Sequence, residues 1–194
     1  MTTTVPSLPA AYFEALYAGD PDPWDFRTSQ YEAEKYAATL AALPRPRYAA
    51  ALEIGCSIGV LTRLLAPRCD RLLAIDGSAR ALATARRDVG PLPGLTFEQR
   101  EVPRQWPAGR FDLILLSEVI YYWDAEDLAQ VAAQCRRALQ PGGEILMVHW
   151  TGTTDYPLSG DAAAEAFIAA TAPTLTLQWQ SRAPRYRMDL LRRG

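Results

Sequence analysis

The stretch Leu52-Glu53-Ile54-Gly55-Cys56-Ser57-Ile58-Gly59 decides the fold, because in it a short apolar run ends at a glycine-rich turn. The run over residues 50–54 predicts a strand, and the helical pattern over residues 60–66 follows the turn directly. A strand, a glycine-rich turn and a helix in this order begin a β-α-β unit. We therefore expect the turn at the carboxyl end of a strand, where open α/β sheets bind ligands.

The same alternation of strand and helix continues along the chain. Further strand-like runs cover residues 71–75, 95–99, 111–116, 144–149, 174–180 and 186–191. Helical patterns cover residues 78–89, 124–139 and 161–170, with a capping box at Ser29-Gln30-Tyr31-Glu32 that opens an earlier helix ending at Leu43. This order predicts an α/β fold with a doubly wound, mostly parallel seven-stranded sheet. The arginine-rich residues 182–193 predict a solvated edge hairpin.

Composition excludes several classes of function. The 194 residues carry 20 basic and 22 acidic side chains, so no strong field attracts nucleic acid or an anionic membrane. No apolar run approaches the length of a membrane span, and the N-terminus lacks the pattern of a signal peptide. Three widely spaced cysteines and one histidine indicate neither a disulfide framework nor a metal site. We expect a cytoplasmic protein that binds no nucleic acid, membrane or metal.

The glycine-rich turn permits two interpretations. As Gly-x-Ser-x-Gly it matches the nucleophile elbow of α/β-hydrolases, and Ser57, Asp112 and His149 follow in the order of a hydrolase triad. Alternatively, the turn lets the backbone approach a nucleotide-type cofactor. A hydrolase elbow follows several strands, whereas most of the 54 residues before Gly55 have the pattern of helix and loop. Asp76 lies 21 residues after Gly55, where an acid that binds ribose hydroxyls is expected, so the cofactor interpretation is favoured.

The identity of the cofactor depends on the charges around the turn. The dinucleotide fingerprint needs glycines where this chain has Ser57 and Val60. Glu53 at the end of the strand would also repel a pyrophosphate, since two anions would meet in a desolvated cleft. A cationic sulfonium with an α-ammonium group tolerates a carboxylate there.

These residues resemble class I S-adenosylmethionine-dependent methyltransferases. Residues 52–59 are similar to their first motif and Asp76 to the ribose-binding acid. Phe111-Asp112-Leu113-Ile114 resembles the fourth strand, and Leu139-Gln140-Pro141-Gly142-Gly143 resembles the turn before the fifth. The resemblance implies a Rossmann-like fold, S-adenosyl-L-methionine as cofactor and S-adenosyl-L-homocysteine as product.

The flanking segments are similar to a narrower group, the nodulation protein S family. They are Asp22-Pro23-Trp24, Tyr31-Glu32-Ala33-Glu34-Lys35-Tyr36, Ser117-Glu118-Val119-Ile120-Tyr121-Tyr122 and His149-Trp150. The family N-methylates the amino sugar at the end of a de-acetylated chitooligosaccharide. The resemblance therefore implies an enzyme that methylates a small-molecule acceptor, preferably an amine on an amino sugar. Alternatives are an O-methyltransferase of a small metabolite, a serine hydrolase, or a cofactor-binding module without catalysis.

The resemblance also implies a division of one domain, residues 1–194, into three parts. Residues 1–46 would form an N-terminal helical lid, 47–150 the cofactor-binding core, and 151–194 a substrate-side loop, helix and C-terminal hairpin. The residues implied to hold the cofactor are Trp24, Arg27, Glu53, Gly55, Ser57, Gly59, Asp76, Gly77, Ser78, Glu101, Val102 and Glu118. Among them, Arg27 would pair with the carboxylate of the methionine part. Trp24 alternatively anchors the lid to the core.

Three residues are candidates for catalysis, namely His149, Glu118 and Tyr121. An amine must be neutral to attack a methyl group, and a histidine with an ordinary pKa is suited to take its proton. Alternatively, His149 is a hydrogen-bonded residue that closes a strand. Tyr121 and its neighbours either line the acceptor pocket or pack onto the next helix. Asp155-Tyr156 is favoured as an ordinary turn over a substrate-specificity element.

Overall fold

The structure, a computed structural model, describes residues 5–194, which form two compact units. One unit is Pro9–Glu101, and the other is Val102–Gly194 together with the described residues 5–8. The first four residues of the expected lid lie outside the described part. All seven expected strands are present among residues 5–194, and helices separate the first five strands except between the third and the fourth, so the α/β class is confirmed. No helix within that range is long and apolar enough to cross a membrane.

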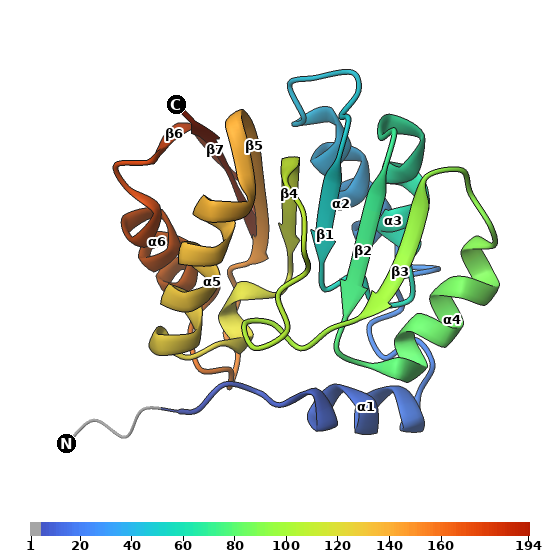
Figure 1. The fold of residues 1–194 in the computed structure, drawn as a ribbon. Helices are drawn as coiled ribbons and strands as arrows, with labels where there is room; N and C mark the ends of the chain where they lie inside the picture. The colour runs from blue at the N-terminus through green and yellow to red at the C-terminus, as the bar shows by residue number, and fades with distance from the viewer. Residues whose placement is uncertain (1–4) are drawn as a thin grey trace. The chain divides into compact units, whose positions relative to one another are not determined.

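The unit Pro9–Glu101 is built on three parallel strands that lie side by side (Figure 1). Their bounds are β1 Ala51–Ile54, β2 Leu72–Asp76 and β3 Leu95–Gln99, with β2 in the centre. The helices are α1 Ala10–Gly19, α2 Gln30–Ala41, α3 Val60–Leu65, η1 Ala66–Arg68 and α4 Ala79–Val89. Neighbouring helices contact each other, α2 against α3 and α3 against α4. The parallel register brings the turns after β1 and β2 to the same edge.

Local sequence explains where these helices begin and end. Ser29 caps α2 by accepting a hydrogen bond from the Glu32 amide, as the capping box predicts. The helix ends at Ala41 rather than at the expected Leu43, because a proline at position 44 disfavours helical backbone in the residue before it. Ser78 caps α4 in the same way through the Ala81 amide.

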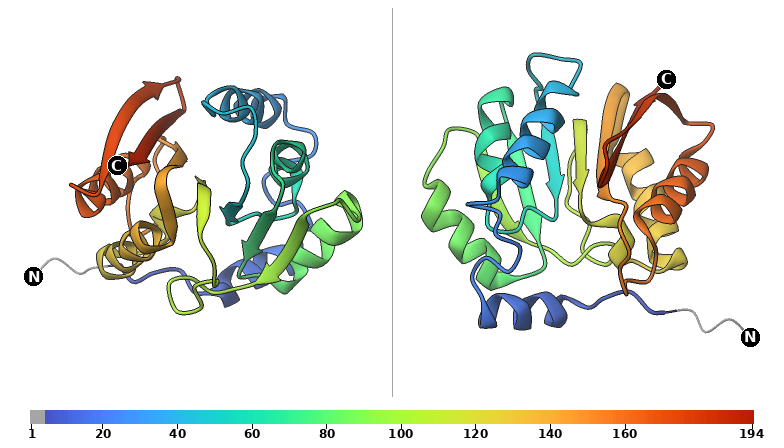
Figure 2. Two further views of the ribbon diagram at one scale, coloured as in Figure 1. Left: turned by 45° about the horizontal axis from the view of Figure 1, so that its top comes forward. Right: turned by 180° about the vertical axis from the view of Figure 1, so that it is seen from behind.

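The unit Val102–Gly194 is built on a mixed sheet with the strand order β4-β5-β7-β6. The bounds are β4 Phe111–Ser117, β5 Leu139–Trp150, β6 Leu175–Arg182 and β7 Tyr186–Arg193. β4 and β5 are parallel, and β7 is antiparallel to β5 and β6. Helices α5 Ala125–Ala138 and α6 Gly160–Thr171 lie against each other (Figure 2), and the short 3-10 helix η2 Ile120–Tyr122 contacts α6.

β5 begins five residues earlier than the apolar pattern indicates. The expected turn over residues 140–143 belongs to the strand, because Leu139 already pairs with Phe111 of β4. Gly142 has a φ of +71°, and the register between β4 and β5 shifts at this point. The glycines therefore bend the strand rather than precede it.

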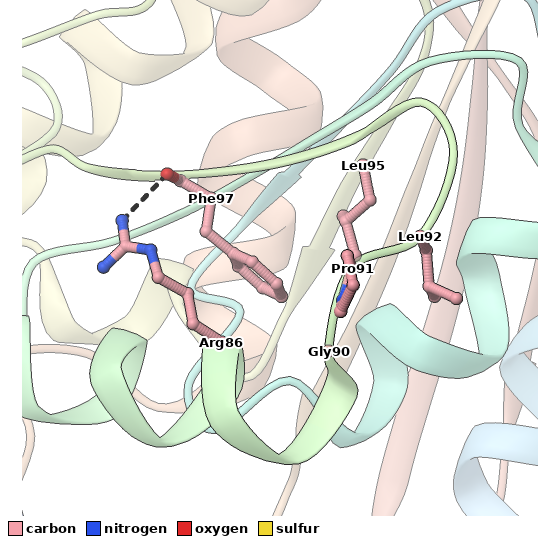
Figure 3. Close-up of a pocket in the computed structure, with 6 residues that line it drawn as sticks. All are labelled: Arg86, Gly90, Pro91, Leu92, Leu95 and Phe97. Atoms are coloured by element: carbon pink, nitrogen blue, oxygen red, sulfur yellow. Dashed lines mark hydrogen bonds between the residues drawn. The ribbon is translucent and has the colours of Figure 1, made fainter.

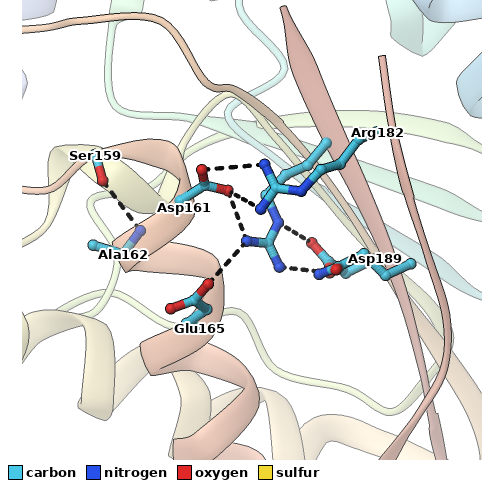
Figure 4. A network of polar contacts seen from close by, with 8 residues as sticks. Ser159, Asp161, Ala162, Glu165, Arg182 and Asp189 are labelled. Carbon is cyan, nitrogen blue, oxygen red and sulfur yellow. Dashed lines mark hydrogen bonds and ion pairs between the residues drawn. The ribbon is translucent and has the colours of Figure 1, made fainter. Parts of the chain in front are cut away.

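The C-terminal hairpin is not a merely solvated edge, because Arg187 on β7 is fully buried. Its guanidinium donates two hydrogen bonds to the Asp189 carboxylate, at 2.9 and 2.8 Å (Figure 4). A third N–H reaches Asp161 on α6 at 2.8 Å, and Arg182 on β6 binds the same carboxylate at 2.7 Å. The expectation of a solvated hairpin is wrong for Arg187 because α6 supplies a carboxylate that the local sequence does not reveal.

This network gives a stability prediction. Arg187→Ala leaves the Asp189 carboxylate buried without its cation, so we expect the free energy of unfolding to fall by about 3–5 kcal/mol. The matched control is Arg182→Ala, since the Arg182 side chain is 49% exposed, and its loss should cost less than about 1 kcal/mol. Urea unfolding of both variants measures the difference. Equal losses would show that burial of the pair does not matter.

Candidate functional site

The turn after β1 has a left-handed backbone at three positions. Gly55, Ser57 and Gly59 have φ angles of +79°, +51° and +81°. A Cβ on Gly59 would lie 2.8 Å from the Val89 side chain on α4, so close packing requires glycine there. Ser57 has no such freedom, and its conformation costs on the order of 1 kcal/mol. The surrounding structure must therefore hold Ser57 in place.

Asp76, the last residue of β2, holds that turn. Its Oδ2 accepts a hydrogen bond from the Ser57 amide at 2.9 Å, and its Oδ1 accepts one from the Ser78 amide at 2.8 Å. Burial raises the pKa of Asp76, and the amides of Ser78 and Ser57 oppose that rise. One carboxylate thus joins the turn after β1 to the turn after β2. The structure brings together Ser57, Asp76, Gly77 and Ser78 as expected from the sequence.

Glu53 lies at the end of β1 and is 2% exposed. Its Oε2 has no hydrogen-bond partner among the described residues. Burial raises the pKa of Glu53 to about 8, and the charge of Asp76 adds to the rise. A buried carboxyl of this kind gains most from a cation, which would favour its ionised form.

The hydroxyl of Ser57 contacts Tyr17 of α1, with 2.5 Å between the two oxygens. Burial raises the pKa of the Tyr17 hydroxyl, so this partner is not a base that could activate a serine nucleophile. Trp24 packs in the same cluster, with its ring centroid 5.8 Å from that of Tyr17 and 5.5 Å from that of Phe26. The geometry of Trp24 is that of an anchor for the N-terminal segment. Its contact with a cofactor stays a prediction.

Three further residues are expected to hold the cofactor, namely Arg27, Glu101 and Val102. The Arg27 guanidinium donates to Asp88 of α4 at 2.7 Å, so pairing with a ligand carboxylate would require an exchange of partners. Glu101 is exposed and Val102 is half-buried. The roles expected for these three residues stay predictions.

In the unit Val102–Gly194, Glu118 connects the end of β4 to the end of β5. Its φ is +55°, and its amide donates to the Val148 carbonyl at 2.8 Å. Its Oε2 accepts hydrogen bonds from the Tyr121 hydroxyl at 2.6 Å and from the Trp150 amide at 2.8 Å. Glu118 and Tyr121, both predicted from the sequence, are therefore in direct contact.

His149 is fully buried beside this pair. Its Nε2 accepts a hydrogen bond from the Ile120 amide at 3.3 Å, and its ring meets the Tyr121 ring edge-on at 5.5 Å. A nitrogen that accepts from an N–H carries no proton of its own. The geometry therefore matches the alternative considered for His149, a hydrogen-bonded residue that closes the strand. Its role as a base stays a prediction.

Tyr156 is a residue of this region that the sequence did not favour. Its ring stacks on Tyr121 at 5.3 Å and meets Tyr122 edge-on at 4.7 Å, in the loop that follows β5. Burial raises the pKa of Tyr121 and Tyr122, so both hydroxyls are neutral at physiological pH. We call Tyr121, Tyr122 and Tyr156 the tyrosine cluster. The sequence signal that could have identified Tyr156 is an aromatic residue in the loop after the fifth strand.

A pocket elsewhere in Pro9–Glu101 does not coincide with the candidate site. It has a volume of about 280 Å³ and is lined by Arg86, Gly90, Pro91, Leu92, Leu95 and Phe97 (Figure 3). Leu95 pairs with the first residue of β2, whereas Asp76 is the last residue of that strand. The pocket therefore lies at the opposite end of the strands. Within residues 5–194, no group of three or more His, Cys, Asp and Glu side chains is placed to hold a metal ion.

Glu53 makes stability depend on pH. Because its pKa is raised from 4.5 to about 8 in the folded chain, its contribution to stability is complete below pH 4.5 and is lost as the pH rises through about 8. Glu53→Gln is isosteric and does not titrate, so we expect it to melt at least about 4 °C above the wild type at alkaline pH. The two proteins should melt together at acidic pH. Thermal unfolding across this range checks the difference, and parallel curves would refute the shift.

The chain is similar in sequence to a known family of proteins. The family model of nodulation protein S (NodS) matches residues 15–148. Nodulation protein S of Bradyrhizobium diazoefficiens is 35% identical over 116 residues, which are 59% of this chain and 54% of the relative. The chain thus spans about half the length of the curated relatives it matches.

Two solved structures share the fold. A Pseudomonas syringae protein assigned as a methyltransferase is 38% identical with a TM-score of 0.74, and the match covers 85% of this chain and all of the other. The N-methyltransferase NodS of Bradyrhizobium japonicum, solved with S-adenosyl-L-homocysteine, is 21% identical with a TM-score of 0.81. That match covers 96% of this chain and all of the other. The Rossmann-like class I methyltransferase fold is confirmed, and the chain belongs to the nodulation protein S family.

Proposed function

We propose that the chain is an S-adenosyl-L-methionine-dependent N-methyltransferase whose acceptor is a small-molecule amine, with an amino sugar of the chitooligosaccharide type preferred. The observation that carries the proposal is the Asp76 carboxylate, which joins the turns after β1 and β2 through the Ser57 and Ser78 amides. Membership of the nodulation protein S family supports it. So does the similarity to an N-methyltransferase solved with the demethylated product.

The residues of Pro9–Glu101 fit this cofactor. Asp76 uses one acceptor direction of each oxygen for a backbone amide, which leaves capacity to accept hydrogen bonds from two ribose hydroxyls. Glu53 is buried with an oxygen that lacks a partner, and a cationic ammonium group would satisfy it. Gly55 and Gly59 carry no Cβ and allow the backbone to approach a ligand. When bound, S-adenosyl-L-methionine supplies a methyl group on a sulfonium.

We assign the recognition of the acceptor to Glu118 and the tyrosine cluster. The Glu118 carboxylate can accept a hydrogen bond from an amine or ammonium, and the Tyr121 hydroxyl fixes its direction. Holding the amine in one orientation supplies much of the acceleration in a methyl transfer. For His149 we propose a positioning role, since its Nε2 fixes the amide of Ile120 in η2.

The ribose role of Asp76 is tested by binding. Asp76→Ala removes the acceptor for two hydroxyls, so we expect the affinity for S-adenosyl-L-homocysteine to fall about 10- to 100-fold. Isothermal titration calorimetry measures this directly. The matched control is Asp70→Ala, because Asp70 pairs with Arg47 at the surface and its side chain is 56% exposed. An Asp76 variant that binds as tightly as the control would refute the assignment.

The two roles considered for His149 predict different results. In His149→Gln the side-chain oxygen can still accept the Ile120 amide, but no base remains. With a positioning role we expect His149→Gln to keep turnover within about tenfold of the wild type, whereas a missing base would cost about 100-fold or more. His149→Ala loses both properties and should be the slower of the two. Equal losses of turnover of about 100-fold or more in both variants would show instead that His149 acts as a base.

The acceptor is identified by mass spectrometry of candidate substrates incubated with S-adenosyl-L-methionine. De-acetylated chitooligosaccharides and amino sugars should gain the mass of one methyl group, and the N-acetylated forms should not. Methylation of hydroxyl compounds alone would favour an O-methyltransferase. No product with any acceptor, together with intact cofactor binding, would favour a binding module.

A further inference from the structure

Helix α1 carries two polar side chains that reach the two turns flanking Asp76. Glu14 and Tyr17 are three residues apart and so lie on the same face of the helix. Glu14 contacts the turn after β2, and Tyr17 contacts the turn after β1. The first turn of α1 also lies close to the site, since a Cβ on Gly77 would be 3.3 Å from the Cβ of Ala10.

The Glu14 carboxylate is tied to the start of α4. Its Oε2 accepts hydrogen bonds from the Ser78 hydroxyl at 2.6 Å and from the Arg80 amide at 3.2 Å. Its Oε1 lies 3.1 Å from Nε of Arg80. The Ser78 hydroxyl lowers the pKa of Glu14, so the carboxylate is ionised at neutral pH. Negative charge is also favoured at a helix N-terminus. Glu14 therefore fixes the backbone at residues 78–80.

Tyr17 makes the corresponding contact on the other side. The Tyr17 side chain is 7% exposed and packs against Ile58 and Ala81. Its hydroxyl forms a hydrogen bond with the Ser57 hydroxyl. Ser57 has the left-handed backbone that a non-glycine residue rarely adopts. A contact to its side chain helps to hold that conformation.

The amides of Ser57 and Ser78 are the two donors that orient the Asp76 carboxylate. We infer that Glu14 and Tyr17 are positioning residues that set the orientation of Asp76 toward the ribose by fixing these two amides. The inference rests on the ribose role of Asp76 proposed above. It differs from a covering role for α1, because a cover would affect every bound ligand alike, whereas positioning of Asp76 affects the recognition of the ribose hydroxyls.

That difference is measurable with a pair of ligands. S-adenosyl-L-homocysteine and its 2′-deoxyribose analogue differ in one hydroxyl, so the ratio of their dissociation constants reports how well Asp76 recognises the ribose. We expect the wild type to prefer the natural ligand. In Glu14→Gln and in Tyr17→Phe we expect this preference to fall about fivefold, because weaker control of the amides lets the carboxylate rotate. Calorimetry on the full chain gives both constants without a measurement of activity.

Glu34→Gln is the matched control. Glu34 is an exposed carboxylate on α2 that accepts a hydrogen bond from Gln30, and its replacement should leave the ratio unchanged. Tyr17→Phe removes only a hydroxyl, so it keeps the inference testable should Glu14→Gln fold poorly. Equal weakening of both ligands in the variants would overturn the positioning role and leave α1 as a cover. A wild type that binds the natural ligand without preferring it would overturn the ribose role itself.

Discussion

The hydrogen bonds of the Asp76 carboxylate are the contacts on which the candidate site depends. Each oxygen accepts one backbone amide, and the two amides belong to turns that follow different strands. Parallel pairing of β1 with β2 places both turns at the same edge, but pairing alone does not fix a strained Ser57 or aim a carboxylate. A half-buried carboxylate needs hydrogen-bond donors to stay ionised, and the amides of Ser57 and Ser78 are among the donors that the chain supplies. Because each Asp76 oxygen accepts only one of these amides, both oxygens can still accept a hydrogen bond from a ligand hydroxyl.

The unit Val102–Gly194 uses the same device with another acid. Glu118 follows β4 in a left-handed conformation, as Ser57 follows β1, and its carboxylate accepts hydrogen bonds from η2 and from the end of β5. In both units, then, a carboxylate at the end of a strand organises the loops around it. Strain at these positions is typical of functional sites, where the surrounding contacts over-determine an unusual backbone.

Some of this arrangement was predictable from the sequence because it is local or periodic. The strand and helix pattern, the capping box at Ser29 and the spacing from Gly55 to Asp76 all follow from residues close in the chain or from regular repeats. Long-range contacts were not predictable. Glu14 meets Ser78 across 64 residues, and nothing in α1 marks Glu14 as different from a surface acid. Arg187 was expected in solvent because its partner Asp161 lies in another element. The sequence favours an ordinary turn at Tyr156, since its stacking on Tyr121 leaves no pattern in a single sequence.

The central claim is that one carboxylate holds both turns and also receives the cofactor. Amide hydrogen exchange at Ser57 and Ser78 tests it most directly. With the ligand at its dissociation constant for the wild type, S-adenosyl-L-homocysteine should slow exchange at both amides in the wild type but at neither in Asp76→Ala, whose weaker binding leaves it almost unoccupied, and without ligand Asp76→Ala should speed exchange at both amides together. Exchange that is unchanged at either amide in the variant, or protection by the ligand that survives the loss of Asp76, would contradict it.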